Sequence, residues 1–457
     1  MHFYCTTIFS KMEVAKHKEN QKFSVFFCEI SKNGFSEKKQ TFHANYLLKN
    51  CPVFSIIKRD TSRMPRYEQT AIVKGAFSMK ILIFSASTGG GHKRAAAALE
   101  DTIKHIAPDV SVTVVDGLKA IGKTFDKTVV GGYYFLVKQT PSVYGGLYKI
   151  TDRENLMYKA VMKSNASKAN HLLVEIEKHQ PDVIIVCHAF ITAMVAKLKR
   201  KGKINSTVVS LITDYDAHRT YIAEGVDAYV IAEPQMAKKL VEEYGVDEEK
   251  IYPIGIPTFE KFNIPGAKEE IFRREGLDPQ KTTILLMAGS FGVTGVLDFY
   301  RQLAESDDRL QLIVITGKNS KLYEKLEAAV DELGAAKHTK LLYFVNNVED
   351  YMHISDIIVT KPGGLTITES LACHLPMAIY NAYPGQEQYN VDFLLKENAA
   401  IAIDKKHGAE QIAALLRSPE KLEAMRENCK RLAQPKAAEN MFKLVKELSA
   451  PSAEENQ

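Results

Sequence analysis

The segment Met79-Lys80-Ile81-Leu82-Ile83-Phe84-Ser85 leads through Ala86 into Ser87-Thr88-Gly89-Gly90-Gly91-His92, and an alanine-rich stretch from Lys93 to Ile106 follows. An apolar run, a glycine-rich turn and a helical pattern in this order are typical of a strand, a tight loop and a helix. The same order recurs downstream, where Ile357-Ile358-Val359 leads into Pro362-Gly363-Gly364. Between these points apolar strands alternate with helices, which predicts an α/β protein with parallel, doubly wound sheets.

The predicted strands fall into two groups. The first comprises 80–84, 111–115, 183–186, 207–212 and 228–231, and the second comprises 284–287, 310–315, 340–345, 357–360 and 377–380. Between them, Tyr252-Pro253-Ile254-Gly255-Ile256-Pro257 contains two prolines that resist the continuation of regular structure. We therefore expect a first domain at 79–257, a linker at 258–266, a second domain at 267–433, and a helix with a tail at 434–457.

Residues 1–78 differ from the rest of the chain. They mix short aromatic patches such as Phe23-Ser24-Val25-Phe26-Phe27 with lysine and glutamate, and they lack the continuous apolar core of a signal peptide. We expect a poorly ordered leader before a natural start at Met79, with a genuine accessory segment as the alternative. The six cysteines of the chain show no CxxC or metal-ligand spacing, as a reducing cytoplasm would permit.

Composition limits the class of protein without choosing a function. With 457 residues, 45% of them hydrophobic and 25% charged, the chain is long enough for two or three domains with ordinary cores. No apolar run reaches the length needed to cross a bilayer, so we expect a soluble or peripheral protein. The net charge of +5 fits an anionic membrane surface or a nucleotide ligand but selects neither.

Two neighbouring segments carry groups that suit a sugar nucleotide. In Lys361-Pro362-Gly363-Gly364-Leu365-Thr366-Ile367-Thr368-Glu369, glycines let the main chain approach a ligand, and the first N–H groups of the following helix suit a diphosphate. The carboxylate of Glu369 would repel a diphosphate, so we expect it to accept hydrogen bonds from ribose hydroxyls. Pro384-Gly385-Gln386-Glu387-Gln388-Tyr389-Asn390 adds polar groups that match sugar hydroxyls. A glycine turn that opens a surface helix is the alternative.

His92 is the candidate base. It falls at the N-terminus of the predicted helix, where the positive end of the macrodipole disfavours imidazolium and keeps the ring neutral near pH 7. A neutral imidazole can take the proton from an attacking alcohol, which is the task of a base in glycosyl transfer. A histidine that caps the helix or binds a phosphate passively is the alternative.

These residues, in their order and spacing, resemble the family of monogalactosyldiacylglycerol synthases and processive diacylglycerol glucosyltransferases, relatives of the enzyme that adds N-acetylglucosamine to the peptidoglycan lipid precursor. The resemblance covers the chain from Met79, and its further landmarks are Tyr134, Pro141, Tyr144, Tyr148, Thr213-Asp214, His218, Gly255-Ile256-Pro257 and Gly289-Ser290-Phe291-Gly292. It implies a GT-B fold, in which two Rossmann-like domains face each other across a cleft. Where we would expect a tryptophan shortly after His218, the chain has Tyr221 and no tryptophan anywhere, which bears on the acceptor rather than on the reaction.

The resemblance also implies an activity and a set of roles. The activity is an inverting, metal-independent transfer of glucose or galactose, from UDP-glucose or UDP-galactose, to diacylglycerol or a glycosylated diacylglycerol. His92 would be the catalytic base. Apart from the resemblance, we expect Asp214 to orient His92 or the acceptor, with His218 as a nearby polar contact. The UDP-binding residues would be Gly289, Ser290, Phe291, Gly292, Phe344, Val345, Gly363, Gly364, Thr366 and Glu369. The sugar would contact Gln386, Glu387 and Asn390, and the acceptor or the membrane would contact Gly90, Gly91, Tyr134, Tyr144, Tyr148 and His218. No cofactor, metal or nucleic acid is expected.

Residues 118–150 are the predicted membrane contact. They interleave lysines with aromatic and aliphatic side chains, a mixture that suits a lipid headgroup boundary: Lys119, Lys123, Lys127, Lys138 and Lys149, with Phe125, Tyr133, Tyr134, Phe135, Leu136, Tyr144 and Tyr148. An amphipathic helix pair packed on the first domain, with its aromatics inward, is the alternative. Because a diacylglycerol acceptor must be taken from a bilayer, the resemblance favours peripheral binding to anionic lipid at the cytoplasmic face of the cell membrane.

Four other interpretations compete with this one. Residues 117–124 fit the G-x-x-x-x-G-K-T pattern of a P-loop kinase or ATPase, but their apolar members continue as a helical stripe. Asp214-Tyr215-Asp216 resembles a cation-binding D-x-D, although that architecture has one sheet. Ser87 to His92 is a poor match to the dinucleotide fingerprint G-x-G-x-x-G. A UDP-sugar sensor without turnover would use the same cleft.

Overall fold

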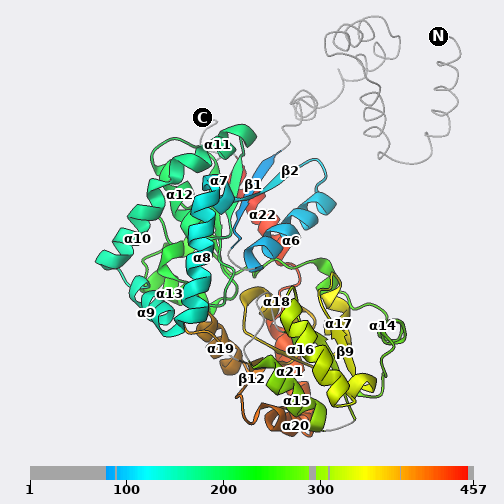
Figure 1. The fold of residues 1–457 in the computed structure, drawn as a ribbon. Coiled ribbons are helices and arrows are strands. Elements are labelled where there is room, and N and C mark those ends of the chain that lie inside the picture. Colours follow the sequence, from blue (N-terminus) through cyan, green and yellow to red (C-terminus); the bar gives the residue numbers. More distant parts are fainter. Residues whose placement is uncertain (1–78, 88–89, 288–294, 307–308, 381, 451–457) are drawn as a thin grey trace, which may run out of the picture. The chain divides into compact units, whose positions relative to one another are not determined.

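In the computed structural model of the protein, the described residues are 79–87, 90–287, 295–306, 309–380 and 382–450. Their strands form two six-stranded sheets, ordered β2-β1-β3-β4-β5-β6 and β12-β11-β10-β7-β8-β9, with every neighbouring pair parallel (Figure 1). The prediction of two parallel α/β sheets is confirmed. The predicted leader at 1–78 and the glycine loop at 289–292 lie outside the described residues.

The first sheet is built around β1, whose Ile81 to Phe84 are fully buried because helices cover both faces of a parallel sheet. Its strands are β1 (Lys80–Ser85), β2 (Ser111–Asp116), β3 (Val183–Val186), β4 (Thr207–Leu211), β5 (Ala228–Val230) and β6 (Ile251–Tyr252). Its helices are α6 (Gly91–Ile106), α7 (Gly117–Ile121), α8 (Lys123–Gln139), α9 (Pro141–Thr151), α10 (Leu156–Ser167), α11 (Ala169–His179), α12 (Ala189–Arg200) and α13 (Gln235–Glu242).

The second sheet has the same alternation of strand and helix. Its strands are β7 (Thr282–Met287), β8 (Leu310–Ile315), β9 (Thr339–Leu342), β10 (Ile357–Thr360), β11 (Met377–Tyr380) and β12 (Ala400–Ile403). Its helices are α14 (Lys268–Glu275), α15 (Val296–Ser306), α16 (Ser320–Glu332), α17 (Val348–Ile354), α18 (Gly364–Ala372), α19 (Gln386–Lys396), α20 (Gly408–Leu416) and α21 (Pro419–Leu432). The short 3-10 helices are η2 (Arg219–Tyr221), η3 (Glu248–Lys250), η4 (Glu260–Phe262) and η5 (Ala335–Lys337). The segment where we expect the linker contains η4.

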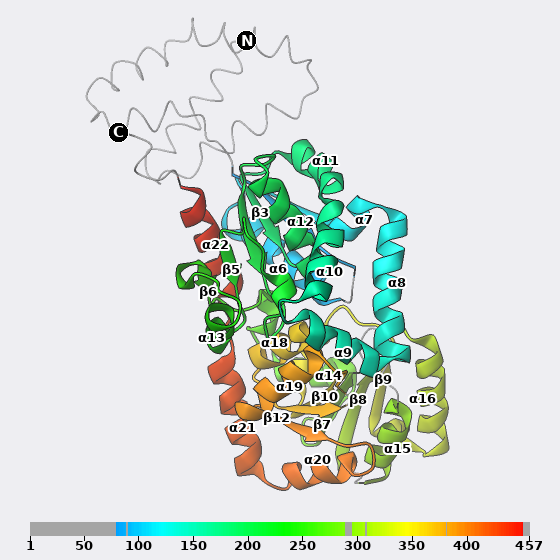
Figure 2. The ribbon, with the colours of Figure 1, turned by 90° about the vertical axis from the view of Figure 1, so that its left-hand side faces the viewer.

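The last helix returns to the first sheet. α21 packs on the second domain against α18, whereas α22 (Ala437–Ser449) packs against α6 and β4 of the first (Figure 2). Gly255 makes room for this return, since a Cβ atom there would lie 2.6 Å from the side chain of Gln434. The return ties the end of the chain to the helix that carries His92.

The structure shows what the P-loop-like segment forms and whether any described helix could cross a membrane. Residues 117–121, the start of the P-loop-like segment, are the helix α7, with Leu118 and Ile121 in the core, so this stretch does not form an open phosphate loop. Among the described residues, no helix is both long enough and apolar enough to span a bilayer.

Candidate active site between the two sheets

His92 is the second residue of α6, at the edge of the first sheet where β1 and β3 end. Its Nδ1 lies 2.9 Å from Thr213 Oγ1, and the ring also makes a hydrogen bond with the backbone of Cys187. The Cys187 amide already donates to Phe84, so the Cys187 carbonyl is the group that accepts from the ring. One ring nitrogen therefore carries the proton, and the other carries the lone pair that a base needs.

Burial lowers the pKa of His92 to about 4, and the Cys187 contact opposes this shift. The imidazole of His188 lies edge-on to it, with ring centroids 5.1 Å apart, and burial also holds the pKa of His188 well below its ordinary value. Both rings are therefore neutral at pH 7. We expected a neutral His92 from the helix dipole, and the structure adds burial as a cause.

The loop after β4 connects His92 to the second domain. Next to Thr213, the buried carboxylate of Asp214 accepts hydrogen bonds from two amides of α19, Gln386 at 2.6 Å and Asn390 at 3.3 Å. Burial raises the pKa of Asp214, and the two amides oppose this shift. The contact with His92 that we expected from Asp214 is made by Thr213 in this structure. The other predicted role of Asp214, to orient the acceptor, stays a prediction.

Asn390 is the centre of this connection, with no exposed surface. Its Oδ1 accepts from the Tyr215 amide at 2.9 Å, and its Nδ2 donates to the Pro362 carbonyl at 2.9 Å as well as to Asp214. The Tyr215 hydroxyl lies 3.0 Å from Thr368 Oγ1. Asn390 thus joins the β4 loop to the glycine turn of the second domain. Its predicted contact with the sugar stays a prediction.

The paired glycines before α18 have different surroundings. A Cβ atom on Gly364 would lie 2.1 Å from the Thr213 carbonyl oxygen, so the close approach of the β4 loop requires glycine at this position. Gly363 has open space around its Cα and caps the helix, and Thr366 lies half-buried in the first turn. The first turn of α18, with its N–H groups, therefore lies where the two domains meet.

Glu369, the predicted ribose ligand, lies one turn further along α18 and is 1% exposed. Its Oε1 forms an ion pair with Arg94 of α6, whereas its Oε2 is buried with no hydrogen-bond partner among the described residues. Burial raises the pKa of Glu369 to about 7, and Arg94 opposes the rise. Sequence analysis missed Arg94. Its signal was its place two residues after His92, on the same first turn of α6.

Glu387 is held by its own domain. Its Oε1 lies 2.6 Å from Lys361 Nζ, and its Oε2 accepts from the Tyr383 amide at 3.0 Å. Lys361 directly follows β10, so its ammonium group lies at the same edge as the α18 N-terminus. Lys361 was not among the predicted site residues. The signal was a cation just before a glycine turn that was predicted to face a diphosphate.

The predicted acceptor tyrosines of α9 contact the second domain. Gly385 has a φ of 96°, and a Cβ atom there would lie 3.1 Å from the ring of Tyr148. His218 Nε2 lies 2.9 Å from the Tyr148 carbonyl oxygen. Burial raises the pKa of Tyr144 and Tyr148, so both phenols are neutral. These half-buried rings line the junction of the domains, and Tyr134 is also half-buried. The alternative of inward-facing aromatics placed such rings on the first domain, whereas Tyr144 and Tyr148 lie against Gly385 of the second.

Other apolar side chains on the same helices are exposed. Five large ones lie on the consecutive helices α8, α9 and α10: Phe135, Val143, Ile150, Leu156 and Met157. The exposed fraction is largest for Leu156, at 86%. Lys149 and Lys159 are exposed near them. We call these five residues the exposed apolar set. Phe135 was named in the predicted membrane contact, and Val143 and Ile150 lie within its range of 118–150, whereas Leu156 and Met157 lie outside it.

The two carboxylates of the D-x-D-like segment have different partners. Asp216 accepts from Lys239 at 2.8 and 3.0 Å, whereas Asp214 accepts from the α19 amides. Among the described residues, no group of three or more His, Cys, Asp or Glu side chains is arranged to hold a metal ion.

The remaining predicted residues lie at the edges of the site. Gly90 is exposed before α6, and Gly91 opens α6 and faces Leu365 of α18. Phe344 and Val345 follow β9, with Phe344 exposed and Lys318 lying over its ring.

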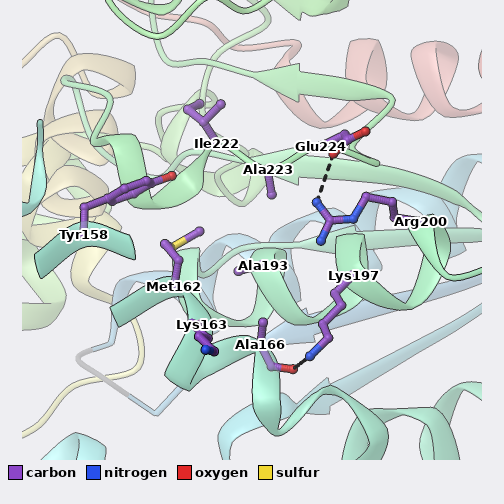
Figure 3. A pocket seen from close by; sticks show the side chains of 10 residues that line it. All are labelled: Tyr158, Met162, Lys163, Ala166, Ala193, Lys197, Arg200, Ile222, Ala223 and Glu224. Atoms are coloured by element: carbon purple, nitrogen blue, oxygen red, sulfur yellow. Dashed lines mark hydrogen bonds and ion pairs between the residues drawn. The ribbon is translucent and has the colours of Figure 1, made fainter. Parts of the chain in front are cut away.

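A separate pocket of about 400 Å³ lies in the first domain between α10, α12 and the segment after η2 (Figure 3). Lys197 donates to the Ala166 carbonyl, and Arg200 pairs with Glu224. Its lining includes the apolar side chains of Met162 and Ile222. None of the predicted site residues lines this pocket, and two of its three cations are bound to protein groups.

Two family matches divide the chain in the same way as the two sheets do. Residues 92–258 match the family described as Monogalactosyldiacylglycerol (MGDG) synthase, and residues 268–432 match Glycosyl transferases group 1. The processive diacylglycerol beta-glucosyltransferase of Bacillus pumilus is 31% identical over 363 residues, which cover 77% of this chain and 91% of the relative. The Bacillus subtilis enzyme of the same name is 30% identical over 375 residues, with the same coverage.

Solved structures support the fold. MurG of Acinetobacter baumannii superposes with a TM-score of 0.54 and 13% identity, over 81% of this chain and 99% of its own. MnaA of Staphylococcus aureus, solved with UDP, superposes with a TM-score of 0.55 and 16% identity, over 80% of this chain and 96% of its own. The predicted GT-B architecture is confirmed.

Proposed function

Because the chain belongs to the family of monogalactosyldiacylglycerol synthases and processive diacylglycerol glucosyltransferases, we propose that it transfers glucose or galactose from a UDP-sugar to diacylglycerol or a glycosylated diacylglycerol. The chain is a glycosyltransferase of glycolipid synthesis. The observation that carries the finer proposal is the position of His92: a neutral imidazole, bound to Thr213, at the junction of the two domains.

We propose a single in-line displacement at the anomeric carbon. The lipid hydroxyl enters from the first domain, and the unprotonated nitrogen of His92 takes its proton as the new glycosidic bond forms. The bond from the anomeric carbon to UDP breaks on the opposite face, so the configuration inverts. Movement of the two domains excludes water and limits hydrolysis of the donor.

The second domain would hold the donor. Backbone N–H groups at the start of α18 are oriented before reaction, and Lys361 adds a positive charge at the same edge. Together they would stabilise the charge that grows on the departing UDP, so we propose that transfer needs no metal. Glu369 would accept from ribose, and Gln386, Glu387 and Asn390 would contact the sugar.

The first domain would meet the membrane. The exposed apolar set, with Lys149 and Lys159 nearby, can insert between anionic headgroups while the lysines contact phosphates. Because α9 also carries Tyr144 and Tyr148 at the domain junction, a lipid hydroxyl taken up beside this helix would enter the junction at which His92 also lies. We propose that the enzyme acts at the cytoplasmic face of the membrane.

The test uses the full chain with vesicles that contain diacylglycerol and anionic phospholipid. UDP-glucose or UDP-galactose is added in the presence of EDTA, and UDP release and glycolipid are followed by mass spectrometry. Glycolipid from one donor would support the proposal and identify the sugar. UDP release without glycolipid would point to hydrolysis or another acceptor. Tight UDP-sugar binding with no turnover would favour the sensor.

A further inference from the structure

We propose, on the basis of the proposed function, that Arg94 is a positioning residue for the donor, which holds Oε1 of Glu369 so that Oε2 accepts a hydrogen bond from a ribose hydroxyl. The first domain would then complete the nucleoside site of the second. The first support is geometric. The ion pair joins α6 to α18, and it engages one carboxylate oxygen while the other is left buried and without a partner among the described residues.

A buried carboxylate oxygen without a donor is unfavourable, because it has lost its hydrogen bonds to water and has no hydrogen bond from the protein to replace them. A ribose hydroxyl is a neutral donor that would satisfy Oε2 without displacing Arg94. Arg94 is itself oriented from a second side, since its guanidinium carbon lies 5.8 Å from the centre of the Phe262 ring in η4. The arginine is therefore fixed between the segment that joins the domains and the carboxylate.

Because Glu369 is 1% exposed, a nucleoside can reach Oε2 only when the domains separate and close again over it. Closure would bring Arg94 back to Oε1, so donor binding and domain closure would be linked. His92 lies on the same turn of α6 and would return to the site in the same movement. Donor binding would thus favour the arrangement in which the base is in place.

Arg94 also favours the ionised form of Glu369. The charged groups that face this carboxylate come from three other elements: Arg94 of α6, Lys261 of η4 and Glu349 of α17. Burial raises the pKa of Glu369 to about 7, and Arg94 is the strongest opposing influence. Without Arg94 the carboxyl would hold its proton to higher pH and would be a poorer acceptor.

The experiment measures binding of UDP and of 2′,3′-dideoxy-UDP to the full chain by calorimetry across pH 6 to 9. For Arg94→Gln we expect UDP to bind roughly tenfold more weakly at pH 7.5, with dideoxy-UDP unchanged. In the same variant, the pH midpoint at which the preference for UDP over dideoxy-UDP appears should move upward. In Glu369→Gln this preference should not change with pH. Lys104→Gln is the control, because it removes a cation from α6 that pairs with the nearby Glu100 and with no other acidic group among the described residues.

Three outcomes would overturn the proposal. Tighter UDP binding by Arg94→Gln would show that Arg94 blocks the nucleoside site. Equal loss for both ligands would place the effect of Arg94 on the phosphates or on folding, which thermal unfolding of the same variant distinguishes. An unchanged preference would show that Arg94 does not act on ribose. Absence of UDP binding by the unmodified chain would instead contradict the proposed function.

Discussion

The two domains have the same layered architecture and differ in what they bring to their junction. The first brings side chains whose protonation burial controls, namely His92, Asp214, Tyr144 and Tyr148. The second brings a helix N-terminus, glycines and the amides Gln386 and Asn390, with Glu369 as the buried carboxylate. The proposed base thus lies on one side, and most of the groups proposed to bind the donor lie on the other.

The connections between strands differ in the same way. Between β2 and β3 the first domain inserts the helices α7 to α11, and the exposed apolar set lies on three of them. The corresponding connections of the second domain are shorter, such as α16 with η5 between β8 and β9. Under the proposed function, the larger insertion of the first domain would serve the substrate that is in a bilayer, and the second domain would serve the donor, which is in water. The predictions below test this division.

The largest effect should come from His92→Ala. Without the base, the rate constant for glycolipid formation should fall roughly 10²- to 10⁴-fold. UDP affinity should stay close to that of the unmodified chain, because we propose that the donor is held by groups of the second domain and by Arg94 rather than by His92. Initial rates and calorimetry measure the two quantities. His105→Ala is the control, because this exposed histidine lies on the same helix. A large loss of UDP affinity in His92→Ala would remove the division of roles.

Asn390→Leu should cause the next largest effect, through stability. The buried Tyr215 amide, the Asp214 carboxylate and the Pro362 carbonyl would each lose a hydrogen bond, so we expect a loss of about 3 kcal/mol in the free energy of unfolding. Chemical denaturation measures it, with the exposed Gln388→Leu of the same helix as control. If the two variants unfold alike, the junction is not held by this side chain, and its role as a sugar ligand would gain weight.

Much of the fold could be predicted because it depends on local pattern. The strands β3, β8, β10 and β11 were predicted to the residue, since buried parallel strands are short, continuous apolar runs between turns. The missed strands β6 and β12 lie at sheet edges. β6 has two residues before Pro253, and β12 is a partly exposed Ala-Ile repeat, so neither has the apolar run of a central strand.

The site could be predicted only as far as each residue acts alone. Glycine turns and a histidine at a helix start are visible in sequence, and the structure brings His92, Gly364 and Gln386 together at one junction. The pairings across the junction, such as Arg94 with Glu369, join residues far apart in the chain, and they depend on how two domains dock. No local pattern encodes docking. For the same reason, Tyr144 and Tyr148 were expected to contact the acceptor or the membrane, whereas in the structure they lie half-buried against Gly385 of the second domain.

Gly364→Ala tests the docking directly and should cost less than Asn390→Leu. The added methyl group would lie 2.1 Å from the Thr213 carbonyl oxygen, so the β4 loop must move. We expect a loss of about 2 kcal/mol in stability, because neither backbone segment can yield freely. Gly363→Ala is a closely matched control for stability, since nothing lies within 4 Å of its added Cβ atom and its φ of −75° suits alanine. Equal denaturation midpoints would mean that the domains do not meet this closely in solution.

The smallest effect should come from Leu156→Asn, which tests the membrane side of the comparison. Leu156 is the most exposed member of the exposed apolar set, so its removal should leave folding and UDP affinity unchanged. Loss of one inserted aliphatic side chain should weaken binding to anionic vesicles roughly tenfold, as cosedimentation measures. Val174→Asn is the control, because Val174 is 65% exposed but lies on α11, outside the set. If both variants bind vesicles equally well, the exposed apolar set does not insert, and the positive charges of the first domain would have to account for membrane binding. Raising the salt concentration then separates these two causes, because salt screens exposed charges but does not weaken apolar insertion.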